Sequence, residues 1–331
     1  MTKAAVGLYL MSPSEVTGLD RARWAEERGF DSVWIADGGG KMHALTLAGA
    51  VASQTRKVRV GTGIVPVFTH TPAVLASSAL TLAQLAPGRV ILGLGASTSG
   101  MMEGWHGIPY VKPLSRVRET TLVLRRMLAG EKVAFEGETL STRGFRLNPP
   151  PQQPPEIFLA ALRPKMLELV GEIADGVVLH LCPVEVVPRM LDHIKAGAEK
   201  AGRRLADIEI ALRVNAFVGD DLAAARDHFR TILGTYFSAT AYNRFFAWCG
   251  REAEAEQFTQ GFRDGDREKT RAALNDGLVE SLGLLGSAEK CRAELRALFE
   301  AGIQTAIINP FSPRPEEAQA TFEAFAPEHF A

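Results

Sequence analysis

Cysteine is scarce in this chain of 331 residues, and its three copies, Cys182, Cys249 and Cys291, stand far apart. They form no Cys-x-x-Cys pair, so neither a disulfide framework nor a zinc site is indicated, and we expect no metal. An excess of charge of one sign is also missing, because 37 basic and 38 acidic residues give a formal net charge of −1. This balance favours neither nucleic acid nor a membrane surface as a partner.

Long apolar runs are absent as well. The longest stretches reach about eight residues, whereas a membrane helix needs roughly 18. The run Ala4–Met11 follows Lys3 but has no small-residue cleavage site after it, so it predicts a buried first strand rather than a signal peptide. Together with the sparse cysteines, these features predict a cytoplasmic protein.

Short apolar runs recur along the whole chain, separated by amphipathic stretches. They are continuous rather than alternating, as expected for parallel strands covered on both faces. Eight such candidate strands are Val6–Leu10, Val33–Ala36, Val58–Val65, Val90–Gly95, Ile157–Leu162, Val177–Leu181, Ile208–Val218 and Thr305–Asn309. Repeated strand–helix units of this number predict an α/β fold, a TIM (β/α)8 barrel formed by residues 1–331 as a single domain.

Two segments are too long for simple strand–helix loops. Residues 131–156 contain a predicted hairpin, Val133–Leu147, and a proline-rich spacer, 148–155. Residues 219–286 have a helical composition and gather nine aromatic side chains between Phe229 and Phe262. The second segment is either a helical hairpin with its own small core or a lid over the barrel mouth.

Active sites of TIM barrels lie at the C-terminal ends of the strands. The predicted ends here are rich in glycine, as where backbone approaches a flat cofactor closely. The pair Gly93-x-Gly95 lacks the third glycine and the downstream acid of a dinucleotide fingerprint, so NAD binding by that route is not indicated.

Several of these segments carry a family resemblance. They are Gly29–Asp37, Val60–Ile64, Gly88–Gly95, Glu103–Gly107, Lys112–Arg116, Ile157–Pro164 and Glu172–Gly176. In their order and spacing the chain resembles the bacterial luciferase-like superfamily, within it the branch that uses the deazaflavin coenzyme F-420. The match covers the chain to about residue 180, and the final strand–helix unit fits as well.

The resemblance implies a TIM barrel with insertions, usually a homodimer, that holds coenzyme F-420 or flavin mononucleotide (FMN) at the strand ends. It also implies a non-proline cis peptide after the third strand, whose counterpart is Gly63-Ile64. The implied cofactor-binding residues are Asp37, Gly61, Thr62, Gly63, Ile64, Gly95, Ala96, Ser97, Ala161, Leu162, Arg163, Pro164, Lys165, Met166 and Gly176. Asp37 is also a candidate for a helix N-cap.

One departure from the family concerns the proton donor. Characterised deazaflavin dehydrogenases of the family have histidine directly after the aspartate of the second strand, whereas Asp37 is followed by Gly38-Gly39-Gly40. His70, His106 and Glu103 are the remaining catalytic candidates, each with an exposed or structural role as the alternative. His180 points either into the mouth or into the core.

The predicted helix after Ile157–Leu162 begins with Pro164, which suits a first helical position. Its N-terminus would lie at the catalytic face, so it is a candidate phosphate site with Arg163 adding a charge-assisted bond. We therefore predict an oxidoreductase that transfers hydride between coenzyme F-420 and a small organic substrate. The alternatives are an FMN-dependent monooxygenase and a non-catalytic deazaflavin or flavin carrier.

Overall fold

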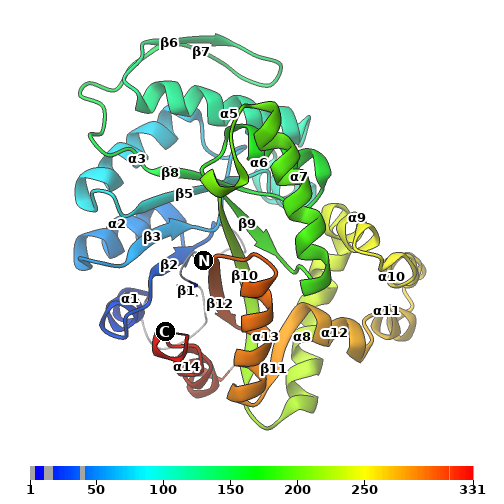
Figure 1. The fold of residues 1–331 in the computed structure, drawn as a ribbon. Helices are drawn as coiled ribbons and strands as arrows, with labels where there is room; N and C mark the ends of the chain where they lie inside the picture. Colours follow the sequence, from blue (N-terminus) through cyan, green and yellow to red (C-terminus); the bar gives the residue numbers. More distant parts are fainter. Residues whose placement is uncertain (1–3, 11–17, 38–41, 313, 331) are drawn as a thin grey trace.

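Eight parallel strands close into a barrel in the computed structural model, which describes residues 4–10, 18–37, 42–312 and 314–330 (Figure 1). Around the barrel they follow chain order, and the last pairs with the first. They are β1 (Ala5–Tyr9), β2 (Ser32–Ile35), β3 (Arg59–Thr62), β5 (Val90–Gly95), β8 (Glu156–Ala160), β9 (Gly176–His180), β10 (Glu209–Val218) and β12 (Thr305–Pro310). The short strand β4 (Val65–Pro66) pairs with β5. The predicted TIM barrel is confirmed.

Helices follow each barrel strand and surround the barrel (Figure 1). They are α1 (Gly18–Glu27), α2 (Ala44–Gln54), α3 (Pro72–Leu85), α4 (Ser99–His106), α5 (Pro113–Leu128), α6 (Pro164–Ile173), α7 (Val187–Lys200), α13 (Ala288–Glu300) and α14 (Pro315–Ala324). Short 3-10 turns lie at Val184–Val186, Leu205–Asp207 and Pro327–His329. In the described parts of the chain, no helix combines the length and apolarity that crossing a membrane requires.

Two aromatic rings fill the middle of the barrel. Trp34 and Phe158 are fully buried, with ring centroids 5.9 Å apart. Each lies beside a glycine of the neighbouring strand: a Cβ on Gly61 would come within 2.6 Å of the Trp34 ring, and one on Gly176 within 2.4 Å of Phe158. These glycines therefore leave the space that the rings occupy.

Ion pairs close the barrel at its N-terminal end. Arg59 bridges Glu156 and Glu209, with 2.9 Å between its Nη1 and Glu209 Oε2. The Thr305 hydroxyl donates to the other oxygen of Glu209 at 2.6 Å. The aromatic rings fill the middle of the barrel and this network fills its N-terminal end. Inward-facing side chains can therefore form a site only at the C-terminal ends of the strands.

The first insertion is a two-stranded antiparallel hairpin, β6 (Val133–Glu136) and β7 (Ser141–Phe145), which lies outside the barrel (Figure 1). It matches the hairpin expected at Val133–Leu147. The proline-rich segment follows it, and the bond Asn148–Pro149 is cis.

The second insertion is built from five helices that project to one side of the barrel (Figure 1). They are α8 (Leu222–Ser238), α9 (Thr240–Trp248), α10 (Glu252–Asp264), α11 (Arg267–Ala273) and α12 (Asp276–Leu282). Within this segment of largely helical composition, Gly283–Gly286 form strand β11. Strand β10 continues past its barrel partners. Strand β11 pairs in parallel with the free edge of β10 at Asn215–Val218.

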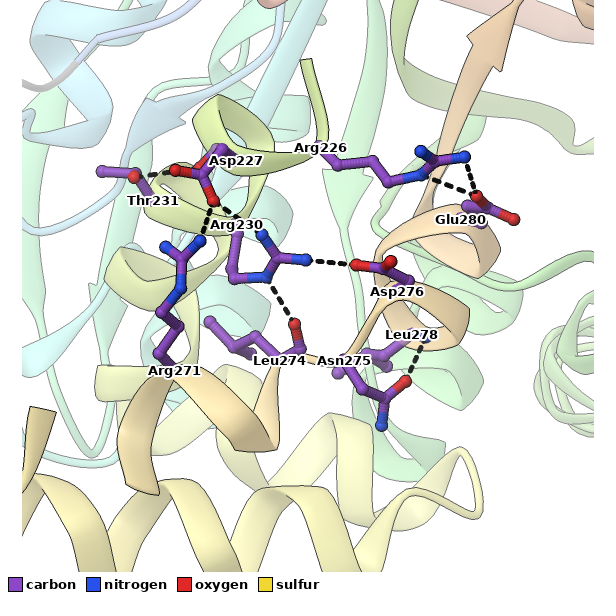
Figure 2. A network of polar contacts seen from close by, with 10 residues as sticks. All are labelled: Arg226, Asp227, Arg230, Thr231, Arg271, Leu274, Asn275, Asp276, Leu278 and Glu280. Carbon is purple, nitrogen blue, oxygen red and sulfur yellow. Dashed lines mark hydrogen bonds and ion pairs between the residues drawn. The ribbon is translucent and has the colours of Figure 1, made fainter. Parts of the chain in front are cut away.

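Arginines connect the helices of this insertion (Figure 2). Arg230 of α8 contacts Asp227 at 2.8 Å, donates to the Leu274 carbonyl at 2.8 Å and pairs with Asp276 of α12. Arg271 of α11 also pairs with Asp227. Exposed pairs of this kind contribute little singly, but as a network they fix α11 and α12 against α8.

Gly93→Ala should destabilise the barrel, because the new Cβ would lie 1.8 Å from the backbone oxygen of Thr62. We expect a loss of about 1–3 kcal/mol or more in the free energy of unfolding, measured by urea denaturation. Gly49→Ala is the matched control: it lies inside α2 with no atom within 4 Å of its Cβ, so it should stabilise by about 0.5–1 kcal/mol. Equal stability of both variants would contradict this packing argument.

Candidate functional site

Backbone and small side chains form one half of the barrel mouth. The peptide bond Gly63–Ile64 is cis, as expected for this position. A Cβ on Gly95 would lie 3.0 Å from Ile64 Cδ1 and 3.1 Å from Ala160 Cβ, so Ile64 and Ala160 pack over this glycine. We call Gly63, Ile64, Gly95 and Ala160 the floor. Gly63, Ile64 and Ala160 are partly exposed and apolar, which suits an aromatic ring system laid against them.

The end of β2 is tied to this floor. The Gly63 N–H donates to the Ile35 carbonyl at 2.7 Å, and the Asp37 N–H donates to the Ile64 carbonyl at 3.0 Å. Asp37 is therefore held beside the floor by its backbone as well as by its side chain.

Asp37, His43 and His70 meet next to the floor. One carboxylate oxygen of Asp37 accepts the Ala44 N–H at 2.6 Å, which makes Asp37 part of the start of α2. Its other oxygen lies 3.8 Å from His70 Nε2 and 3.9 Å from His43 Nε2. The two predicted roles of Asp37, in the site and at a helix start, are therefore compatible.

Hydrogen bonds define how the two histidines face each other. Their Nε2 atoms are 3.2 Å apart. His43 Nδ1 accepts the Thr46 N–H, so its hydrogen is placed on Nε2 and can be donated to His70 Nε2. His70 Nδ1 lies 2.9 Å from Thr69 Oγ1 and 3.4 Å from the Pro66 carbonyl, which suits a hydrogen on that nitrogen. The pair forms a directed chain of hydrogen bonds.

Burial sets the titration of His70, whose side chain is 11% exposed. Burial lowers the pKa of His70 below its ordinary value, and the Asp37 carboxylate opposes this shift. At neutral pH His70 is therefore an imidazole whose Nε2 can take a proton, with a carboxylate near enough to stabilise the cation.

The same three side chains are of types that also bind divalent metals, and their ligand atoms lie within 4.8 Å of one another. A metal at this place would need a free lone pair on both Nε2 atoms. The acceptor role of His43 Nδ1 puts a hydrogen on its Nε2 instead. The described contacts thus favour a hydrogen-bonded histidine pair.

The loop after β5 carries Ser97, Glu103 and His106. Glu103 is exposed and its carboxylate accepts the Tyr110 N–H at 3.2 Å, while the Tyr110 hydroxyl donates to the Ser97 carbonyl at 3.1 Å. Ser97 has a φ of 63°. His106 is exposed at the end of α4, near enough to His70 to disfavour its protonation. Glu103 thus shapes this loop.

The start of α6 lies on the same side of the mouth. No side chain caps it, Pro164 occupies the first turn, and Arg163 precedes it with an exposed side chain. Burial raises the pKa of Tyr110 to about 12, and the nearby charge of Arg163 opposes this shift. Arg163 therefore extends from α6 toward the loop after β5.

The remaining cofactor candidates divide into two groups. Ala96, Ala161, Leu162, Lys165 and Met166 lie at or just after the strand ends, with Lys165 exposed and Ala161 buried.

Gly61, Thr62 and Gly176 lie deeper. Gly61 and Gly176 accommodate the interior rings. The Thr62 hydroxyl donates to the Gly93 carbonyl at 2.9 Å and accepts its N–H at 2.8 Å. The structure therefore explains these three residues by packing. The prediction that Gly176 binds the cofactor is wrong, because Gly176 lies at the start of β9 and not at the C-terminal ends of the strands.

A polar group on the opposite half of the mouth consists of Tyr9, His180, Arg213, Tyr236 and Tyr242, which we call the donor wall. Of these, sequence reasoning considered only His180 and missed the other four. Arg213 lies 4.2 Å above the Tyr9 ring, and His180 Nδ1 is 2.9 Å from the Tyr242 hydroxyl. An arginine within the mostly apolar stretch Ile208–Val218, which also holds Glu209 and Asn215, was the available signal. His180 is buried and faces the mouth within this network.

A cavity of about 170 Å³ lies beside β10. Its lining includes Leu212, Arg213 and Val214 of β10, residues of the segment after β9, and residues of α12 and α13. Since Leu212 and Val214 alternate with the inward-facing Arg213 and Asn215, this cavity lies on the outer side of the strands.

A closed parallel barrel with histidines, tyrosines and an arginine at the C-terminal strand ends defines a TIM-barrel protein with a candidate site at its mouth. The family model described as luciferase-like monooxygenase matches residues 6–305. The chain belongs to the luciferase-like monooxygenase family.

Individual relatives narrow the comparison. A 5,10-methylenetetrahydromethanopterin reductase of Methanolobus tindarius is 28% identical over 300 residues, 90% of this chain and 91% of the relative. An F-420-dependent glucose-6-phosphate dehydrogenase of Nakamurella multipartita is 32% identical over 223 residues, 63% of this chain and 65% of the relative. The solved coenzyme F-420-dependent tetrahydromethanopterin reductase of Methanopyrus kandleri shares the fold, with TM-score 0.83 and 22% identity over 99% of this chain and 100% of that chain.

Proposed function

We propose that this chain is a coenzyme F-420-dependent oxidoreductase that transfers hydride to or from a small organic substrate at the barrel mouth. The observation that carries the proposal is the floor, Gly63, Ile64, Gly95 and Ala160, set between the histidine pair and the open start of α6. The sequence similarity to an F-420-dependent glucose-6-phosphate dehydrogenase over 63% of the chain supports the same cofactor, as does the shared fold of a coenzyme F-420-dependent reductase over 99% of it. We extend the proposal to a homodimer in the cytoplasm.

The residues present fit the cofactor in shape and charge. The floor is apolar and partly exposed, and the uncapped α6 start with Arg163 supplies N–H groups and a positive charge for a phosphate. When bound, coenzyme F-420 supplies a carbon that gives or accepts a hydride. The protein contributes orientation and a partly dry environment for that transfer.

The proton that accompanies hydride transfer is assigned to His70. Its Nε2 faces the mouth beside Asp37, and the His43 N–H that it accepts must be displaced or shared when it takes a proton. In substrate oxidation, His70 would take the proton from a substrate O–H or N–H, and in reduction it would return it. Asp37 stabilises the protonated form by charge.

Purified protein should bind coenzyme F-420 at least about tenfold more tightly than FMN, or ~1.4 kcal/mol in binding free energy. The expected reason is the Gly93–Ser97 strand end, which resembles the deazaflavin branch. Isothermal titration with both cofactors measures the preference. A tenfold preference for FMN would instead support the monooxygenase alternative, and binding of F-420 with no substrate-dependent change in its absorbance across alcohols and carbonyl compounds would support a carrier.

Arg163→Ala should weaken F-420 binding by about 1.5–3 kcal/mol, because a charge-assisted bond to the phosphate is lost. The deazaflavin without phosphate should bind wild type less tightly and be indifferent to the substitution. Arg143→Ala, which removes an exposed arginine from strand β7 outside the barrel, is the control. Equal losses for the two cofactor forms would place the phosphate elsewhere.

His70 should titrate with a midpoint below 6.5, since burial lowers its pKa. Substrate oxidation would then fall as pH decreases through that midpoint, because protonated His70 cannot act as a base. His70→Asn should abolish this limb, and Asp37→Asn should move the NMR titration of His70 to lower pH. His106→Ala, at an exposed position, should retain the limb. A limb that survives His70→Asn would remove His70 from the proton transfer.

A further inference from the structure

Two arginines point into the barrel from opposite ends, and only one has acidic partners. Arg59 at the N-terminal end pairs with Glu156 and Glu209. Arg213 lies on the same strand as Glu209, four residues nearer the mouth, and faces Tyr9, two strands away across the interior. Among the described residues, no carboxylate forms an ion pair with Arg213, and its buried Nε has no hydrogen-bond partner.

An enclosed cation without a counter-ion is costly, because the protein replaces water poorly around it. The Tyr9 ring offsets part of this cost through a cation–π contact at 4.2 Å. Arginine keeps its charge at any ordinary pH. Arg213 is half-buried as a residue, and Tyr9 and Tyr236 lie against its guanidinium.

The side chains near Arg213 form a chain of hydrogen bonds that leads toward the mouth, in which each side chain donates to the next. Asn309 Nδ2 donates to Asn215 Oδ1 at 2.6 Å, and Asn215 Nδ2 lies 3.4 Å from His180 Nε2. His180 Nδ1 then donates to the Tyr242 hydroxyl at 2.9 Å. With its oxygen accepting from His180, Tyr242 has its own hydrogen left to donate.

These groups stay uncharged. Burial, with the charge of Arg213 as a further cause, holds the pKa of His180 well below its ordinary range. Burial also raises the pKa of the Tyr9 and Tyr242 phenols. The donor wall therefore offers one fixed positive charge and neutral O–H donors, with no carboxylate among its members.

The donor wall also stands across the mouth from the floor. Its strands are β1, β9 and β10, whereas the floor is formed by residues of and next to β3, β5 and β8. Tyr236 and Tyr242 come from α8 and α9 of the second insertion, and each packs edge-on against His180. A substrate lying between the cofactor on the floor and this insertion would meet Arg213.

We propose that Arg213 and the donor wall bind an anionic carboxylate group of the substrate. The inference rests on the proposed function in taking this mouth as the place where substrate binds. A carboxylate fits because its two oxygens match one guanidinium edge, while no second cation is present in the wall to favour a more highly charged group.

The test uses benzoate and its neutral analogue benzamide as probes, titrated calorimetrically into the full chain in low-salt buffer free of carboxylates. Wild type should bind benzoate at least tenfold more tightly than benzamide. Arg213→Met should abolish the preference and leave F-420 affinity within threefold. Arg213→Lys, which keeps the charge but not the planar fork, should retain part of the preference. Arg163→Ala should lose F-420 affinity and keep the benzoate preference.

Equal binding of the two probes to wild type would overturn the proposal, and so would a benzoate preference that survives in Arg213→Met. A tenfold loss of F-420 affinity in Arg213→Met would also overturn it, since the arginine would then hold the cofactor. If Arg213→Met does not fold, wild type and Arg213→Lys decide: an undiminished preference in the lysine variant would rule out recognition by the guanidinium edge. Benzoate preference in a protein that binds no F-420 would leave the anion site standing and remove the proposed function.

Discussion

The packing of Trp34 and Phe158 against glycines is the constraint on which the site depends. Their rings fill the cross-section of the barrel, and Gly61 and Gly176 provide the room for them. Below the rings, Arg59 and its carboxylates close the barrel. Since the interior is filled to this height, side chains that point inward near the C-terminal ends form the surface of a mouth rather than part of a core.

The mouth has two chemically different halves. The floor is made of backbone and small apolar groups, whereas the donor wall has an arginine, a histidine and three tyrosines. The two halves adjoin at the neighbouring strands β8 and β9, and β2 lies between them on the other side. The mouth therefore has one apolar side and one polar side, so under the proposed function cofactor and substrate need not compete for one place.

Much of the fold could be predicted from local sequence. Buried parallel strands read as continuous apolar runs, and the eight predicted runs correspond to the eight barrel strands. Strand β11 could not be found in this way, because it has only four residues and two of them are glycine. It also pairs with an edge that exists only where β10 extends past the barrel.

The site was less predictable, because its contacts join distant positions. His43 is exposed, and its Nε2 meets His70 Nε2 at 3.2 Å across 27 positions of the chain. Arg213 meets Tyr9, about two hundred positions earlier in the chain. Motif matching placed Gly176 with the cofactor residues, since glycines that admit a ring of the core and glycines that admit a ligand look alike in sequence. No local pattern distinguishes these two uses.

The length of β10 has a consequence for how this protein can diversify. Its first half completes the barrel beside β9 and β12, and its last residues carry β11 and the five-helix insertion. The chain thus leaves the barrel at the end of β10 and returns to it at β11, so the insertion begins and ends at the same pair of strands. Helices inserted between these two strands can change in length or sequence while the strands beneath keep their register. A change in the inserted helices can therefore replace Tyr236 and Tyr242 of the donor wall while Arg213, His180 and the floor stay in place on the barrel.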